Sequence, residues 1–172
     1  VTGLTGGHSG GEIHKEKGNA NKLVARILKE LMNDGVDVSL VSFNGGAKDN
    51  AIPRESVAVF ASKDGADYLK DIVQKKTEKI SVEFEHSDPG FQTVFESVDM
   101  CNECMDQTST KHVIDYLYLV DNGFQHRSMA IEGLTLTSLN LGIVKTEGKN
   151  VICNSSIRSA LEEAIDDDVD HI

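Results

Sequence analysis

The stretch NANKLVARILKELMNDGVDVSLVSF, residues 19–43, places an amphipathic helix directly before a strand and decides the class of the fold. Its apolar residues recur every three or four positions as far as Leu31, which is the spacing of one helix face. Gly35 then predicts the end of the helix, because glycine readily adopts the left-handed conformation found there. Residues 36–43 are β-branched and apolar, which indicates a strand.

Two further elements follow this helix-strand unit. Gly45-Gly46 breaks the first strand, and residues 55–62 alternate in polarity and predict a second strand. Asp64 is expected to cap a helix over residues 66–76, because its carboxylate can accept hydrogen bonds from the first free backbone N–H groups. The sequence therefore predicts two strands that are preceded by one helix and followed by another.

Both ends of the first half also indicate strands. Residues 80–85 alternate apolar and polar side chains, which is typical of a half-buried strand, and residues 1–4 resemble the end of one. Residues 1–86 therefore predict the order β-α-β-β-α-β. This order is an α+β, two-layer, ferredoxin-like sandwich with an extended antiparallel sheet and its helices on one face.

The second half, residues 87–172, is expected to complete or extend the same sheet, so that residues 1–172 form a single domain. Residues 91–100 could be strand or helix. The other expected elements are a helix at 109–119, strands at 124–131, 134–145 and 150–158, and an acidic helix at 159–170.

Composition excludes several classes of function. The 172 residues carry a formal net charge of −11, and so the chain lacks the basic surface that nucleic acid or an anionic membrane requires. No apolar run approaches the roughly 20 residues of a membrane span. Three cysteines do not make a secreted disulfide framework, and we expect a cytoplasmic protein.

A glycine-rich segment, Gly6-Gly7-His8-Ser9-Gly10-Gly11, is the sharpest local motif. Four glycines allow the backbone to approach a ligand closely, so that a histidine and a serine can be presented directly to it. A flexible turn with an incidental histidine explains the residues equally well. A phosphate-binding loop is disfavoured, because no Lys-Ser or Lys-Thr follows at the required spacing.

Four collinear segments resemble the lid of aminoacyl-histidine dipeptidases, which are bacterial two-zinc metallopeptidases that hydrolyse Xaa-His dipeptides. The segments run nearly from end to end of the chain: residues 3–22 around the glycine motif, residues 44–54 from Asn44-Gly45-Gly46 to Pro53-Arg54, Thr137-Ser138-Leu139-Asn140-Leu141-Gly142, and Asn154-Ser155-Ser156-Ile157-Arg158-Ser159.

The resemblance implies a lid and dimerisation domain that lacks the catalytic domain. His8 matches a lid histidine that polarises the scissile carbonyl, commonly in the active site of the partner subunit. Asn50 and Arg158 match residues that orient substrate, and a guanidinium suits the C-terminal carboxylate. The resemblance also implies a homodimer. The zinc ligands lie in segments outside this chain, so we expect it to bind no catalytic zinc and to be inactive alone.

Several alternatives stay open. The chain could be an autonomous ferredoxin-like module that binds a small ligand through the glycine motif. Cys101 and Cys104 form a CxxC motif, but no second pair completes a zinc ribbon, and two ordinary thiols are the simpler interpretation. The acidic run at residues 162–170 lacks the spacing of a calcium loop and is expected to be a solvated helix face.

Overall fold

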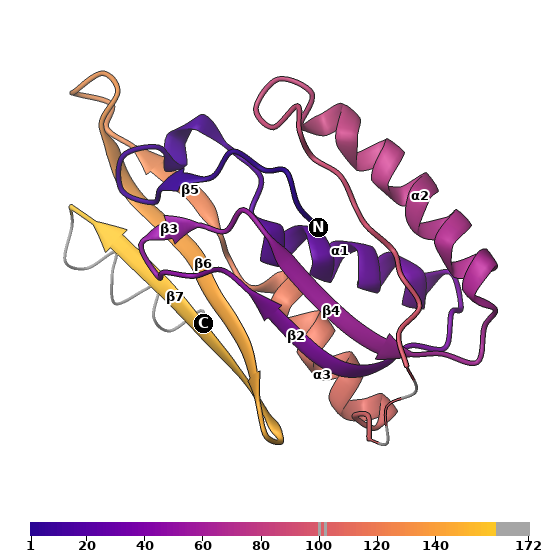
Figure 1. Cartoon of the computed structure of the whole chain (residues 1–172). Helices are drawn as coiled ribbons and strands as arrows, with labels where there is room; N and C mark the ends of the chain where they lie inside the picture. Colours follow the sequence, from indigo (N-terminus) through magenta and orange to yellow (C-terminus); the bar gives the residue numbers. More distant parts are fainter. Residues whose placement is uncertain (100, 102, 161–172) are drawn as a thin grey trace.

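The computed structural model describes residues 1–99, 101 and 103–160. Helices and strands are mixed along this part of the chain (Figure 1). Their order is β1 (Gly7–His8), the short 3₁₀ helix η1 (Ile13–Lys15), α1 (Ala20–Asn33), β2 (Ser39–Gly45), β3 (Ala51–Ile52), β4 (Ser56–Ala61), α2 (Ala66–Glu83), α3 (Gln107–Leu119), β5 (Gly123–Arg127), β6 (Thr135–Glu147) and β7 (Asn150–Ser159).

The main sheet is antiparallel and is organised around the long strand β6. Strand β7 pairs with β6 along one edge, whereas β5 and β2 share the other edge one after the other. Strand β4 extends the sheet beyond β2. The three α-helices lie on one face, and the small β1–β3 pair lies on the other (Figure 1). The predicted α+β class, with an antiparallel sheet and helices on one face, is confirmed.

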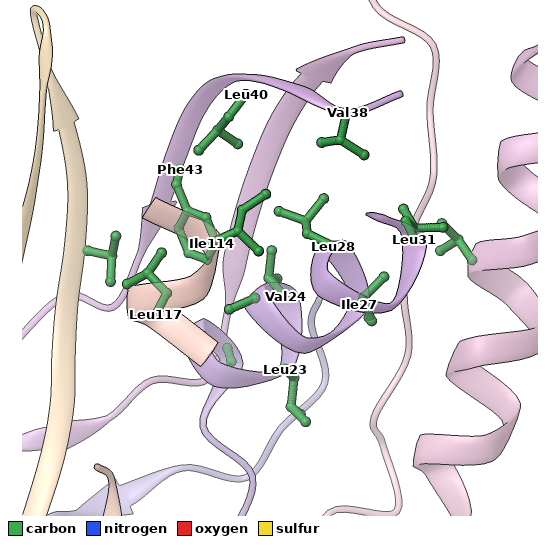
Figure 2. Packing of buried hydrophobic residues seen from close by; sticks show 14 of the residues in the cluster. Leu23, Val24, Ile27, Leu28, Leu31, Val38, Leu40, Phe43, Ile114 and Leu117 are labelled. Carbon is green, nitrogen blue, oxygen red and sulfur yellow. The ribbon is translucent and has the colours of Figure 1, made fainter. Parts of the chain in front are cut away.

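Helix α1 is at the centre of the hydrophobic core. Its inward face packs against β2 on one side and α3 on another, and α2 flanks it (Figure 2). The Asn19 side chain caps the start of the helix by accepting hydrogen bonds from Asn21 N and Lys22 N. Gly35, which the sequence predicts at the helix end, has a left-handed φ of +88° just beyond the last turn. The buried residues of this core include Leu23, Val24, Ile27, Leu28, Leu31, Leu40, Phe43, Ile114 and Leu117.

The predicted strand over residues 80–85 is wrong, because α2 continues to Glu83. Ile80 is fully buried, whereas Val82 is 72% exposed. Leu69, Val73, Thr77 and Ile80 form the buried stripe of one long helix. A threonine in this stripe interrupts the apolar pattern, and its hydroxyl donates to Val73 O at 2.8 Å.

Two other predictions in the first half are also wrong. Residues 1–4 do not form a strand, and Thr2 makes only an isolated bridge to Gln92. Asp64 does not cap α2, which begins after Gly65 without a side-chain cap. Its carboxylate instead accepts from Asp37 N at 3.0 Å and Ser62 Oγ at 3.2 Å. The first half therefore departs from βαββαβ at both ends, and β6 takes the place next to β2.

The second half follows the sequence-based prediction closely. Helix α3 and strands β5, β6 and β7 match the expected helix and three strands, although β5 is shorter than predicted. Of the ambiguous segment, residues 91–99 form neither a helix nor a strand. The acidic helix predicted at 159–170 lies almost wholly outside the described residues. No helix in the described part of the chain is both long and apolar enough to cross a lipid bilayer.

Between the parts of β6 that pair with β5 and with β2, asparagine side chains replace a neighbouring strand as hydrogen-bond partners of the β6 backbone. Leu141 N donates to Asn122 Oδ1 at 2.9 Å, and Leu141 O accepts from Asn19 Nδ2 and Asn21 Nδ2 at 3.2 Å each. These bonds satisfy backbone groups that no strand reaches. Lys22 ties the same end of α1 to α3, because its ammonium donates to three carbonyl oxygens at the end of α3, those of Leu117, Tyr118 and Val120.

The loop that follows β2 passes close over β6 where Gly46 meets Gly142. Gly46 has a φ of +78°, and a Cβ placed on it would lie 1.8 Å from Gly142 O. A Cβ on Gly142 would lie 2.5 Å from Asp49 O. Only glycine permits this contact, so two of the sequence motifs meet where the loop after β2 passes over β6.

Candidate functional site

The glycine-rich segment is the tip of a loop whose two ends are joined by Asp88. This carboxylate is 1% exposed and accepts hydrogen bonds from Thr5 N at 2.7 Å, Thr5 Oγ1 at 2.6 Å and Gly18 N at 2.7 Å. Burial opposes ionisation, but the bonds from Thr5 and Gly18 outweigh it and lower the pKa of Asp88 below its ordinary 3.8. Asp88 therefore stays ionised at neutral pH and fixes the base of the loop.

Glu12 holds the loop from within. Its carboxylate accepts from Lys15 Nζ at 2.9 Å and Lys17 Nζ at 3.1 Å, and Lys17 Nζ also donates to Gly6 O at 2.6 Å. The bonds from Lys15 and Lys17 lower the pKa of Glu12 to about 2. The other carboxylate oxygen lies 3.4 Å from His8 N. A charged network therefore shapes the backbone on both sides of His8.

The His8 ring is exposed and has a defined tautomer. Its Nδ1 accepts a hydrogen bond from Gly10 N at 3.0 Å. A neutral imidazole that accepts at Nδ1 carries its proton on Nε2. His8 therefore presents an N–H donor to the surroundings, which is the group that a developing negative charge on a carbonyl oxygen requires.

Asn50 lies in the loop between β2 and β3, beside the glycine-rich segment. Its backbone oxygen accepts from Ser9 N at 3.0 Å, and β1 pairs with β3 so that His8 is opposite Ala51. The Asn50 residue is exposed. Backbone bonds therefore hold Asn50 and His8 next to each other, although 41 residues separate them in the sequence.

Arg158 reaches the same place from the end of β7. A Cβ on Gly10 would lie 3.1 Å from His8 Cε1 and 3.4 Å from Arg158 Cζ, so the imidazole and the guanidinium flank this glycine. Gly10, Ser138 and Arg158 help line a concavity of about 210 Å³. The structure thus brings all three predicted site residues together around the glycine-rich segment.

Several residues that shape this site carry no signal in the sequence. Asp88 lies 70 residues from Gly18 and follows an unremarkable turn, so nothing local indicates its role. Ser9 belongs to the motif, but its hydroxyl is buried and has no hydrogen-bond partner among the described residues. The spacing of Glu12 to Lys15 could have indicated an ion pair, because residues three apart face each other on a helical turn.

A second concavity, of about 360 Å³, lies between α3 and β7. It is lined by His112, Val113, Tyr116, Val151 and Cys153. Burial raises the pKa of the Cys153 thiol, which leaves it less reactive than an exposed thiol. Burial and Cys153 also raise the pKa of Tyr116. These shifts favour neutral side chains, as expected of groups that pack rather than react.

Potential metal ligands are dispersed over the described part of the chain. Within residues 1–99, 101 and 103–160, no three His, Cys, Asp or Glu side chains lie close enough together to hold a metal ion. A catalytic zinc needs about three protein ligands and an open position. The described side chains therefore do not fit a zinc site.

Comparison with known proteins agrees with this architecture. Cytosol non-specific dipeptidase of Escherichia coli (strain K12) is 37% identical over 167 residues, which cover 96% of this chain and 34% of that protein. The crystal structure of aminoacylhistidine dipeptidase from Vibrio alginolyticus matches with a TM-score of 0.92 and 34% identity, covering 98% of this chain and 34% of that one. The chain thus spans about a third of the length of these relatives.

The resemblance to dipeptidase lids noted in the sequence is confirmed by these matches. The family model described as "peptidase dimerisation domain" matches residues 1–88, which is more than half of the 172 residues. The chain belongs to the M20 peptidase dimerisation domain family.

Proposed function

We propose that residues 1–172 form the single lid and dimerisation domain of a cytoplasmic dipeptidase that hydrolyses Xaa-His dipeptides. The observation that carries the proposal is the meeting of the His8 imidazole and the Arg158 guanidinium at Gly10, with Asn50 bonded to the same segment. The two relatives, a cytosol dipeptidase and an aminoacylhistidine dipeptidase, support the compartment and the substrate class.

Each site residue has a chemical role in this proposal. His8 donates from Nε2 to the scissile carbonyl oxygen and stabilises the oxyanion that forms there, in the active site of the partner subunit. Arg158 binds the C-terminal carboxylate of the dipeptide through its planar pair of N–H groups. Asn50 orients the substrate between them. Closure of the lid excludes water from the peptide bond.

The remaining parts of the reaction belong to the rest of the proposed enzyme. A catalytic domain outside this chain would hold the two zinc ions, and a metal of this kind supplies an activated water in peptide hydrolysis. The chain alone is therefore expected to hydrolyse nothing. It is expected to form a homodimer, which sedimentation of the chain at several concentrations would reveal.

Replacing His8 tests the proposal directly. In the complete peptidase, His8→Ala is expected to lower kcat by about 10²–10³-fold, because one oxyanion donor is lost. Zinc content should not change. His14→Ala is the matched control, because His14 is an exposed histidine of the same loop. Equal activity of His8→Ala and the control would refute the role of His8.

Arg158 is tested by the form of the substrate. Arg158→Ala is expected to raise KM for dipeptides with a free C-terminus more than for the corresponding amides, because only the free carboxylate pairs with the guanidinium. Kinetics with both substrates on the variant and the unchanged enzyme would measure this. An equal effect on acid and amide would remove the carboxylate assignment.

A further inference from the structure

The sequence motif at residues 137–142 has no role in the proposed function, yet one of its side chains lies directly beneath the site. Asn140 is on β6 and is 1% exposed. Its Nδ2 donates to Asp49 O at 2.7 Å and to Ala51 O at 2.9 Å. These two carbonyl groups belong to the residues on either side of Asn50. The Asn140 side chain therefore holds the backbone at Asn50 in place through two hydrogen bonds.

The primary amide of Asn140 suits this contact. One nitrogen with two hydrogens serves two acceptors, which a hydroxyl or a carboxylate cannot do. The neighbouring carbonyl oxygens also fix the amide orientation, and Asn140 Oδ1 has no hydrogen-bond partner within the part of the chain that the structure describes. The backbone of Asp49 also passes close to Gly142, since a Cβ on Gly142 would lie within 3 Å of it.

Further backbone bonds extend this contact to His8. Asn50 O accepts a hydrogen bond from Ser9 N. Ala51, the next residue, pairs with His8 across β3 and β1. In Figure 1 the β3 segment passes in front of β6. A displacement of residues 49–51 would therefore move both the Asn50 side chain and the His8 ring.

The same strand sets the position of Arg158. Along β6 and β7, Asn140 is opposite Ser156 and Ser138 is opposite Arg158. Residues two apart on a strand point to the same face, so Asn140 and Arg158 share one face of the sheet. Asn140 is thus the direct side-chain connection between the loop that carries Asn50 and the strand pair that carries Arg158.

We propose that Asn140 is a positioning residue that fixes Asn50 and His8 relative to Arg158, an inference that rests on the proposed function. Its effect is on the geometry of the substrate and not on the chemistry itself. A misplacement of about 1 Å in such a site can cost about 100-fold in rate. Loss of the Asn140 contacts should therefore reduce activity in a protein that is still folded.

The test uses the complete peptidase with Asn140→Asp and Asn140→Ala. Aspartate keeps the shape but turns carboxylate oxygens toward two carbonyl oxygens, and alanine removes the contact without repulsion. Both are expected to lower kcat/KM by about 10- to 100-fold at temperatures well below the melting transition. The matched control is Asn122→Ala, which removes the side chain bonded to Leu141 N on the other edge of β6 and does not touch residues 49–51.

Double-mutant cycles separate positioning from a general structural effect. The loss caused by Asn140→Ala should be smaller in an Asn50→Ala or a His8→Ala background, because the residue through which Asn140 acts is already absent. Asn122→Ala should lower Tm without changing kcat/KM of the folded enzyme. The inference is overturned if the Asn140 variants change Tm alone, or if their loss is the same in every background.

The outcomes also distinguish this inference from the proposed function. If His8→Ala is as active as the unchanged enzyme, the proposed function fails, and the positioning role fails with it. If His8→Ala is impaired while both Asn140 variants behave like Asn122→Ala, the proposed function stands and only the positioning role is overturned.

Discussion

The helix-backed core and the loop layer, defined as residues 3–18 and 46–52, are held together by different forces. In the core, α1 buries leucine, isoleucine and valine side chains against β2 and α3. In the loop layer, the backbone is fixed by hydrogen bonds to two buried polar side chains, since Asp88 accepts from backbone N–H groups and Asn140 donates to backbone carbonyl groups. Apolar burial stabilises in proportion to area and is not directional, whereas hydrogen bonds define positions.

Stability and function therefore depend on different parts of the chain. The core accounts for most of the free energy of folding, and its side chains do not reach the site. The loop layer contributes fewer buried apolar groups, but it carries His8 and Asn50 and holds them beside Arg158 of β7. Substitutions in one region should therefore be distinguishable from substitutions in the other by comparing Tm with activity.

The largest expected effect on stability is in the core. Phe43 is fully buried, and Phe43→Ala should lower the free energy of unfolding by about 3–5 kcal/mol because it leaves a cavity. His8→Ala, at an exposed position, should change it by less than about 0.5 kcal/mol. Denaturant unfolding of both variants measures the contrast. A similar loss in both would show that the two regions are not separable.

The glycine crossing should be the most sensitive point of the loop layer. Gly46→Ala adds a Cβ at 1.8 Å from Gly142 O and also requires a left-handed conformation, with an expected loss of about 2–4 kcal/mol. Gly148→Ala is the control, because Gly148 has a φ of +58° but no atom within 4 Å of its Cβ position. The control should lose only about 1–2 kcal/mol. Equal losses would remove the argument from close approach.

Asp88 should make the stability that the loop layer contributes depend on pH. Asp88→Asn should cost about 1.5–3 kcal/mol at pH 7, because bonds to a charged acceptor are lost. The folded-state pKa lies below the unfolded value, so this stability is present above about pH 4 and is lost as the pH falls through the lowered pKa. Melting curves from pH 7 to pH 2 should show the gap between the two proteins closing. A constant gap would contradict the assignment.

The smallest expected effect distinguishes helix from strand at the end of α2. Val82 is 72% exposed, so Val82→Glu should change stability by no more than about 0.5 kcal/mol. Ile80→Ala should cost about 2–5 kcal/mol. The strand first predicted here would place both side chains on the same buried face. A large loss for Val82→Glu would therefore favour the strand.

The sequence predicted the elements whose pattern is local. The apolar stripe of α1, the glycine after it and the polarity of β6 and β7 are each visible within a short window. The end of α2 was mispredicted because Thr77 occupies a buried helical position and Ile80, Val82 and Phe84 alternate by coincidence. From polarity alone, a buried threonine whose hydroxyl bonds to its own helix cannot be distinguished from an exposed threonine.

The site was predictable only in part, for the same physical reason. His8, Asn50 and Arg158 were identified through resemblance to a family, and their roles remain predictions. Their proximity depends on contacts between distant parts of the chain, such as Gly46 with Gly142. The bonds from Asn140 span 89 and 91 residues, and no periodicity reports contacts of that range.

The most direct test of the central claim is a crystal structure of the complete peptidase with a non-hydrolysable Xaa-His dipeptide analogue. The account predicts that His8 Nε2 and the Arg158 guanidinium each lie about 3 Å from polar atoms of one ligand molecule, the first at the scissile carbonyl position and the second at the carboxylate. A bound ligand that touches neither side chain, or only one of them while the other faces solvent, would contradict it.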